Sequence, residues 1–194
     1  MALSVAQYNN GSSFAVPSVY SSFSVTTLNP SDLEKRLQRG YRTAKVLLDI
    51  NEFKGCLQFY KQLVYNEAVL KHEVFNRLFA GGGDVASSDV DQNLVDVMGL
   101  VNLYRVEMLN TLCTFILNLY KRPRVLVSTV ELHIIEGKLA YLSDYFERNL
   151  RVQGFNDNPY FETIYKETMD CLDVSVSVGR SYVSHRIEKV NSPS

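Results

Sequence analysis

Residues 92–120 form a segment that is apolar on nearly every side of a helical wheel, and this segment most constrains the fold. Only Asp96, Arg105 and Glu107 carry charge within it. A helix of this kind lies in the middle of a bundle. Its longest uncharged run, MLNTLCTFILNLY (108–120), has 13 residues and includes two Asn, so it is too short to span a bilayer. The segment predicts a buried core helix at about 91–121 and no membrane partner.

Four further helices are predicted from apolar residues that recur three and four positions apart. They cover about 32–49, 52–80 and 128–152, and a fifth segment that starts at Pro159 and runs to about 173. The expected fold class is therefore all-α, an antiparallel bundle of about five helices.

Local signals mark where these helices begin and end. Ser31 with Glu34, and Ser128 with Glu131, have the spacing of capping boxes. Asn158 can cap a helix whose first residue is Pro159, a position that tolerates proline. The three glycines at 81–83 end the second helix.

Both ends of the chain have a different pattern from the bundle at 31–173. Residues 1–30 contain FAVPSVYSSFSV, with apolar side chains at two-residue spacing, which predicts an extended N-terminal arm. Residues 174–194 begin with alternating Val and Ser over 174–178, which is typical of a short strand. We therefore expect an extended, strand-like C-terminal tail that could pair with the arm.

The cysteines and the N-terminus indicate the compartment. Cys56, Cys113 and Cys171 are an odd number, are widely spaced, and lie in predicted helices. This pattern favours reduced, buried thiols over a disulfide framework or a zinc site. The N-terminus also lacks a basic start followed by an apolar block, so no secretory signal is visible. The expected location is cytoplasmic.

Three basic clusters are the main candidates for binding. Because the net charge is −1, any attraction to a polyanion must come from local groups of cations. Such cations can track phosphates, and Arg can contact them in a bidentate way. The first cluster has five cations with no acid between them, opposite an apolar row. The candidate nucleic-acid-binding residues are Lys35, Arg36, Arg39, Arg42 and Lys45, then Lys121, Arg122 and Arg124, and finally Arg148 and Arg151.

Two interpretations of these clusters stay open. Helix ends meet at the poles of a bundle, so the clusters could merge into one patch, with Tyr41 or Tyr120 as a stacking surface for a base. Alternatively, they only solubilise the outer faces of the bundle, and Arg148 and Arg151 complement a helix dipole.

The sequence offers few catalytic groups. His133 and Glu136 have a spacing that two metal ligands could use. A di-iron bundle needs Glu-x-x-His twice and two further carboxylates. No metal site and no cofactor are predicted.

One short motif points to an enzyme family. Arg180-Ser-Tyr-Val-Ser-His185 resembles the Arg-x4-His signature of HEPN-domain ribonucleases, over six residues of the chain. Those proteins are all-α bundles. The resemblance implies that Arg180 and His185 form a catalytic pair that acts across a dimer.

These observations favour a non-enzymatic helical protein that assembles with itself or with other protein subunits and holds RNA or another polyanion. A viral coat or RNA-sequestering protein shares this layout of arm, bundle and tail. The alternatives are a scaffold or adaptor subunit without nucleic-acid binding, and the HEPN-like ribonuclease.

Overall fold

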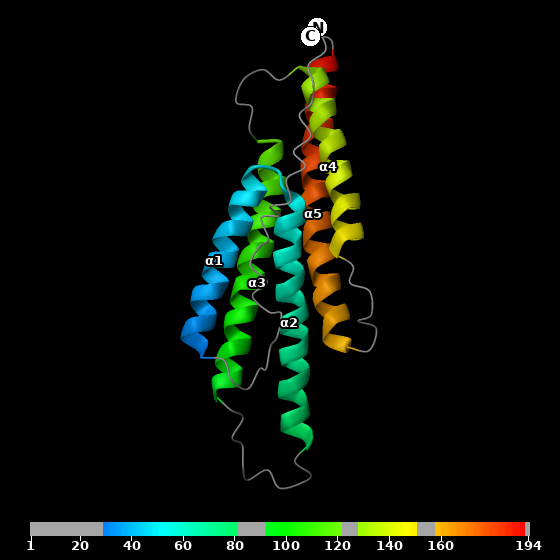
Figure 1. Cartoon of the computed structure of the whole chain (residues 1–194). Coiled ribbons are helices and arrows are strands. Elements are labelled where there is room, and N and C mark those ends of the chain that lie inside the picture. Colours follow the sequence, from blue (N-terminus) through cyan, green and yellow to red (C-terminus); the bar gives the residue numbers. More distant parts are fainter. Residues whose placement is uncertain (1–28, 81–91, 122–127, 151–157, 193–194) are drawn as a thin grey trace.

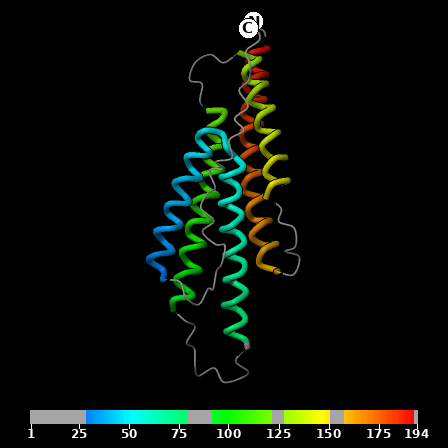
Figure 2. The backbone as a smooth tube through the Cα atoms, in the orientation of Figure 1, coloured from blue at the N-terminus to red at the C-terminus, as the bar shows by residue number. Residues whose placement is uncertain are grey.

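The structure is a computed structural model, and it describes residues 29–80, 92–121, 128–150 and 158–192. The described residues form helices and contain no strand, which confirms the all-α class. Successive helices run in opposite directions along one long axis (Figures 1 and 2). The helices are α1 (Pro30–Asp49), α2 (Phe53–Ala80), α3 (Gln92–Leu119), α4 (Thr129–Leu150) and α5 (Pro159–Asn191).

The order of the helices across the bundle places α3 centrally, as its apolar sequence predicts. α3 packs against α1, α2 and α5 and touches α4, whereas α1 packs mainly on α2 and α3, and α4 packs mainly on α5. As a result α1 and α4 lie on opposite flanks (Figure 1). Other helices do not cover α3 on every side, because Leu103 and Val106 remain exposed.

Two of the predicted helix starts are confirmed, and one is wrong. Glu131 accepts a hydrogen bond from the backbone N–H of Ser128 at 2.9 Å, and the Ser128 hydroxyl accepts one from the N–H of Glu131 at 3.3 Å. The Asn158 side chain accepts from the N–H of Tyr160 at 3.0 Å. In α1, however, the cap is Asn29 rather than Ser31, because the helix already begins at Pro30, which has no N–H to satisfy.

The predicted strand-like tail over 174–194 is wrong, because α5 continues without interruption to Asn191. The inward positions keep helical spacing across the predicted boundary: Leu172, Ser175, Val176, Gly179 and Val183 are buried. The Val/Ser alternation therefore places Val176 inside and leaves Val174 and Val178 exposed. The predicted arm at 1–30 lies outside the described residues, apart from its last two.

Candidate functional site

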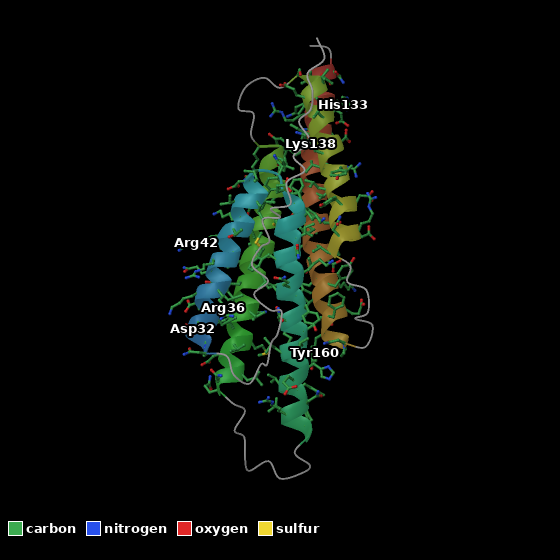
Figure 3. All side chains as sticks on the ribbon, viewed as in Figure 1. Asp32, Arg36, Arg42, His133, Lys138 and Tyr160 are labelled. Carbon is green, nitrogen blue, oxygen red and sulfur yellow. The ribbon has the colours of Figure 1, made fainter. Side chains whose placement is uncertain are left out.

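The most exposed charged surface is the outer side of α1, which we call the cationic face: Lys35, Arg36, Arg39, Arg42 and Lys45. All five side chains are exposed, and α1 packs on the bundle through the opposite row of Leu33, Leu37, Ala44 and Leu48. Arg36 and Arg42 are labelled on α1 in Figure 3. Burial of the apolar row thus fixes the direction of the cations.

Little within the described part of the chain neutralises the cationic face. Lys35 is 3.6 Å from Asp32, but both side chains are more than 60% exposed, so the pair is weak. The other four cations make no ion pair with a described residue. Lys45 also lines a polar groove between α1 and α3, which includes Glu107 and Asn110.

Two members of the other clusters lie within the described residues, and neither belongs to α1. Lys121 is exposed just beyond the end of α3. Arg148 lies on α4, on the flank opposite α1, and pairs with Asp144 at 2.6 Å. Arg122, Arg124 and Arg151 lie outside the described residues.

The two tyrosines proposed as a stacking surface take part in packing instead. The Tyr41 hydroxyl is 2.9 Å from the Thr111 hydroxyl, and its ring meets Tyr104 edge-on at 6.1 Å. Tyr120 is buried against Tyr182, with 4.8 Å between the ring centroids. Tyr104 on α3 is close enough to α1 for its pKa to respond to Glu34 and Arg42. Partial burial raises its pKa, the charge of Glu34 raises it further, and the charge of Arg42 opposes both.

A second candidate site is the groove between α4 and α5 that contains the Arg-x4-His motif. Arg180 and His185 both lie in α5 and both line this groove. The imidazole Nδ1 of His185 is 4.0 Å from a carboxylate oxygen of Glu188. The rest of the lining is polar and includes Glu136, Asp173 and the serines at 143, 177, 181 and 184. The groove therefore holds one imidazole and one guanidinium that reach solvent.

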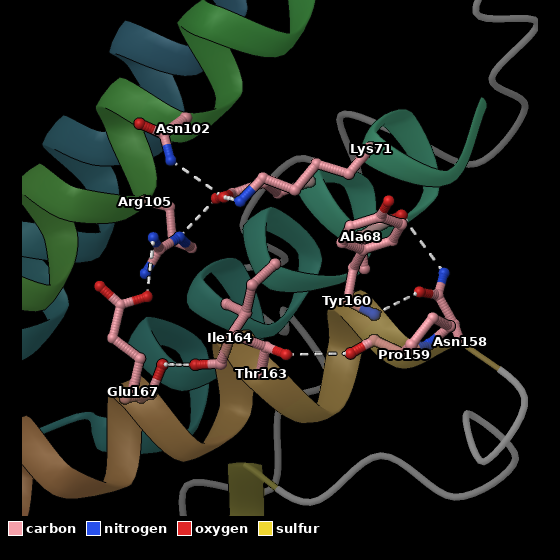
Figure 4. A network of polar contacts seen from close by, with 12 residues as sticks. Ala68, Lys71, Asn102, Arg105, Asn158, Pro159, Tyr160, Thr163, Ile164 and Glu167 are labelled. Atoms are coloured by element: carbon pink, nitrogen blue, oxygen red, sulfur yellow. Dashed lines mark hydrogen bonds and ion pairs between the residues drawn. The ribbon is translucent and has the colours of Figure 1, made fainter. Parts of the chain in front are cut away.

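Sequence reasoning missed a buried ionic network at the centre of the bundle (Figure 4). Glu67 on α2 is fully buried, and Arg105 on α3 is 3% exposed. The Arg105 Nε–H donates to one Glu67 oxygen, and Asn102 donates to the other at 2.9 Å. Lys71 is 2.7 Å from Glu67, and Arg105 also reaches Glu167 at 3.3 Å.

The network has clear electrostatic consequences. Burial alone raises the pKa of Glu67, but Lys71, Arg105 and Asn102 together lower it below its ordinary value. Burial likewise lowers the pKa of Arg105, and Glu67 and Tyr60 more than reverse this effect. Both groups therefore stay charged, and the network ties α2 to α3 and α5. A charged residue inside an apolar helix such as α3 needs a partner of opposite charge. This requirement of Arg105 was the only feature of the sequence that could have indicated the buried network.

The structure offers no arrangement for a metal among its described residues. His133 and Glu136 do meet on α4, at 3.5 Å, but no group of three or more His, Cys, Asp or Glu side chains in the described helices could hold an ion. None of these helices is both long and apolar enough to cross a membrane.

The fold and its sites define an all-α bundle with a cationic outer helix. The chain has no significant match among protein-family models, curated proteins or solved structures.

Proposed function

We propose that this protein is a non-enzymatic helical assembly protein that binds RNA or a similar polyanion through the cationic face of α1. The observation that supports this proposal is the group of four cations, Arg36, Arg39, Arg42 and Lys45, which are exposed and form no ion pair with a described residue. Binding of such cations to phosphates releases condensed counterions, which drives association at low salt.

The size of the face sets the expected strength of the salt effect. Lys35 and Lys45 are ten positions apart on one helix, which corresponds to about 15 Å along its axis. Four or five phosphate contacts on a single strand predict a slope of log K against log salt of about −3. This value is measurable with a single labelled oligonucleotide.

Fluorescence anisotropy of a labelled single-stranded RNA at several salt concentrations tests the proposal. The variant Arg36→Gln/Arg39→Gln/Arg42→Gln should lower the affinity at least tenfold and flatten the slope by about 2, because three phosphate contacts are lost. Arg148→Gln is the matched control, since it removes an exposed arginine from the opposite flank. Absence of binding at low salt, or equal loss in the control, contradicts the proposal.

Assembly is the part of the proposal shared with the scaffold alternative. α4 exposes Val130, Ile134 and Tyr141 on one side of the helix, and each of them is more than half exposed. Apolar side chains gathered in this way mark interaction surfaces. Light scattering of the full chain tests this part, because a monomer at all concentrations argues against self-assembly. A monomer that also fails to bind RNA argues against self-assembly with RNA binding and against self-assembly without it.

A second candidate function, a ribonuclease, is favoured by the continuity of α5. The Arg-x4-His resemblance requires Arg180 and His185 to lie within one long helix, and α5 extends beyond both of them. This candidate predicts metal-independent RNA cleavage that His185→Ala abolishes. His133→Ala is the matched control, because His133 is an equally exposed histidine with a glutamate neighbour. Cleavage that survives in the His185 variant excludes the ribonuclease.

A further inference from the structure

Two of the three cysteines lie together at one edge of the interface between α3 and α5. The Sγ of Cys113 on α3 is 3.7 Å from the backbone carbonyl oxygen of Cys171 on α5. The Ser175 hydroxyl donates to the same carbonyl at 3.0 Å. Cys113 is half-buried, and Cys171 is exposed, contrary to the expectation of buried thiols. The side chain of Cys113 thus covers the helical turn that carries Cys171.

We propose that Cys113 and Cys171 are a redox modification site, which a low-molecular-weight disulfide such as oxidised glutathione converts to an intramolecular disulfide. A disulfide requires Cα atoms within about 7 Å of each other and side chains directed to the same side. The 3.7 Å contact between the Cys113 sulfur and the Cys171 carbonyl oxygen places the two residues side by side on facing helices, and the Cys171 thiol acts electrostatically on the Cys113 thiol. The exposure of Cys171 gives the small disulfide access to the pair.

The chemistry proceeds by two thiol–disulfide exchanges. The Cys171 thiol loses its proton to solvent, and the thiolate attacks one sulfur of oxidised glutathione, which breaks the glutathione disulfide and releases one glutathione thiolate. The Cys113 thiolate then attacks the Cys171 sulfur and releases the second glutathione. In total, two protein thiols are oxidised to one disulfide, and one glutathione disulfide is reduced to two thiols.

The pH dependence follows from the surroundings of Cys113. Burial raises the pKa of this thiol, while its contact with Ser175 lowers it in part. The second exchange therefore accelerates as the pH rises, because more Cys113 becomes thiolate. The neighbouring Cys171 thiol raises this pKa further.

Cys56 provides an internal control within the same chain. Its side chain has no exposed surface, and burial raises its pKa to about 12. It should neither exchange with glutathione nor pair with another cysteine in the folded protein. Modification at Cys56 would instead report unfolding.

Peptide mapping of the full chain after treatment with oxidised glutathione tests the proposal. Proteolysis without reductant should yield one cross-linked peptide pair that contains Cys113 and Cys171, with Cys56 unmodified, and dithiothreitol should separate the pair. Cys56→Ser should still form the link. Cys113→Ser should instead keep one glutathione on Cys171, and Cys171→Ser should acquire neither modification.

Three results would overturn the proposal. Wild-type protein could retain glutathione on Cys171 without forming the link to Cys113. It could form a disulfide between two chains through Cys171. It could also remain unmodified at Cys171. The map of the wild-type chain decides among these outcomes even if a serine variant folds poorly.

Discussion

Arg105→Met is the most informative change in the bundle core, because it removes one charge and keeps much of the volume of the side chain. The variant leaves Glu67 with no exposed surface and without its guanidinium partner. Loss of one partner from a buried pair destabilises a protein by about 3–5 kcal/mol. Lys71 remains 2.7 Å from Glu67 and is one-third exposed, so we expect the lower end, about 3 kcal/mol.

The double variant Glu67→Met/Arg105→Met separates pairing from packing. Removal of both charges leaves no buried ion, and an apolar replacement of such a pair is often neutral or stabilising. Asn102 then loses its acceptor, which costs about 1–3 kcal/mol. We therefore expect the double variant to be no less stable than either single variant, with a large favourable coupling energy between the two positions.

Urea unfolding followed by the helical circular dichroism signal measures these free energies. Arg148→Met is the matched control, because Arg148 is exposed and pairs only with Asp144; its effect should stay below about 0.5 kcal/mol. A cost below about 1 kcal/mol for Arg105→Met, or additive effects in the double variant, would refute the assignment of Glu67 and Arg105 as a charged, coupled pair.

Three further predictions concern stability. The pKa of Glu67 is lowered in the folded state, so its contribution to the free energy of unfolding is complete above the unfolded pKa of about 4.3. This contribution is lost as the pH falls through the folded pKa, and the urea midpoint should therefore drop in acid. Gly40→Ala places a methyl group into the buried Phe59 ring and should cost about 1–3 kcal/mol in urea unfolding, whereas Gly137→Ala faces open space and should stabilise by up to about 1 kcal/mol. Asn51 has φ 63°, so Asn51→Val should lower the thermal midpoint by the equivalent of about 1–3 kcal/mol, whereas Asn51→Gly should leave it nearly unchanged.

The helix boundaries that sequence predicted well are those with purely local causes. Ser128 and Glu131 are three residues apart, and Asn158 precedes Pro159 directly, so the capping contacts need nothing from the rest of the chain. The 174–178 segment differs, because its inward face is made of Ser175, Val176 and Gly179. A row of small and polar residues is not recognised as the buried face of a helix from apolar periodicity.

Tertiary neighbours explain why such small residues are buried there. A Cβ atom at Gly179 would lie 3.0 Å from Leu139 on α4 and 3.1 Å from Tyr120, the residue that follows α3. The larger side chains of these two residues therefore fill the space that α5 leaves. The two-residue alternation at 174–178 predicted a strand, because the large side chains that complete this part of the core belong to residues 40 and 59 positions away in the sequence.

The candidate site shows the same division. The cationic face follows from helical periodicity within α1 alone, and the structure places all five of its side chains outside. Whether Arg148 joins them depends on which helices are neighbours, and α4 lies on the far flank. The Glu67–Arg105 pair joins residues 38 positions apart, and no local pattern predicts such a contact.

The buried Arg105 and the exposed cations of α1 have opposite expected effects on the stability of the fold. Arg105 is paired and buried, so its removal destabilises the bundle. Along α1, Arg36–Arg39 and Arg39–Arg42 are like charges three positions apart, and each such pair destabilises a helix by about 0.2–0.5 kcal/mol. The triple glutamine variant of the cationic face should therefore fold at least as stably as the parent chain. A loss of RNA affinity in that variant would then reflect the missing cations and not unfolding.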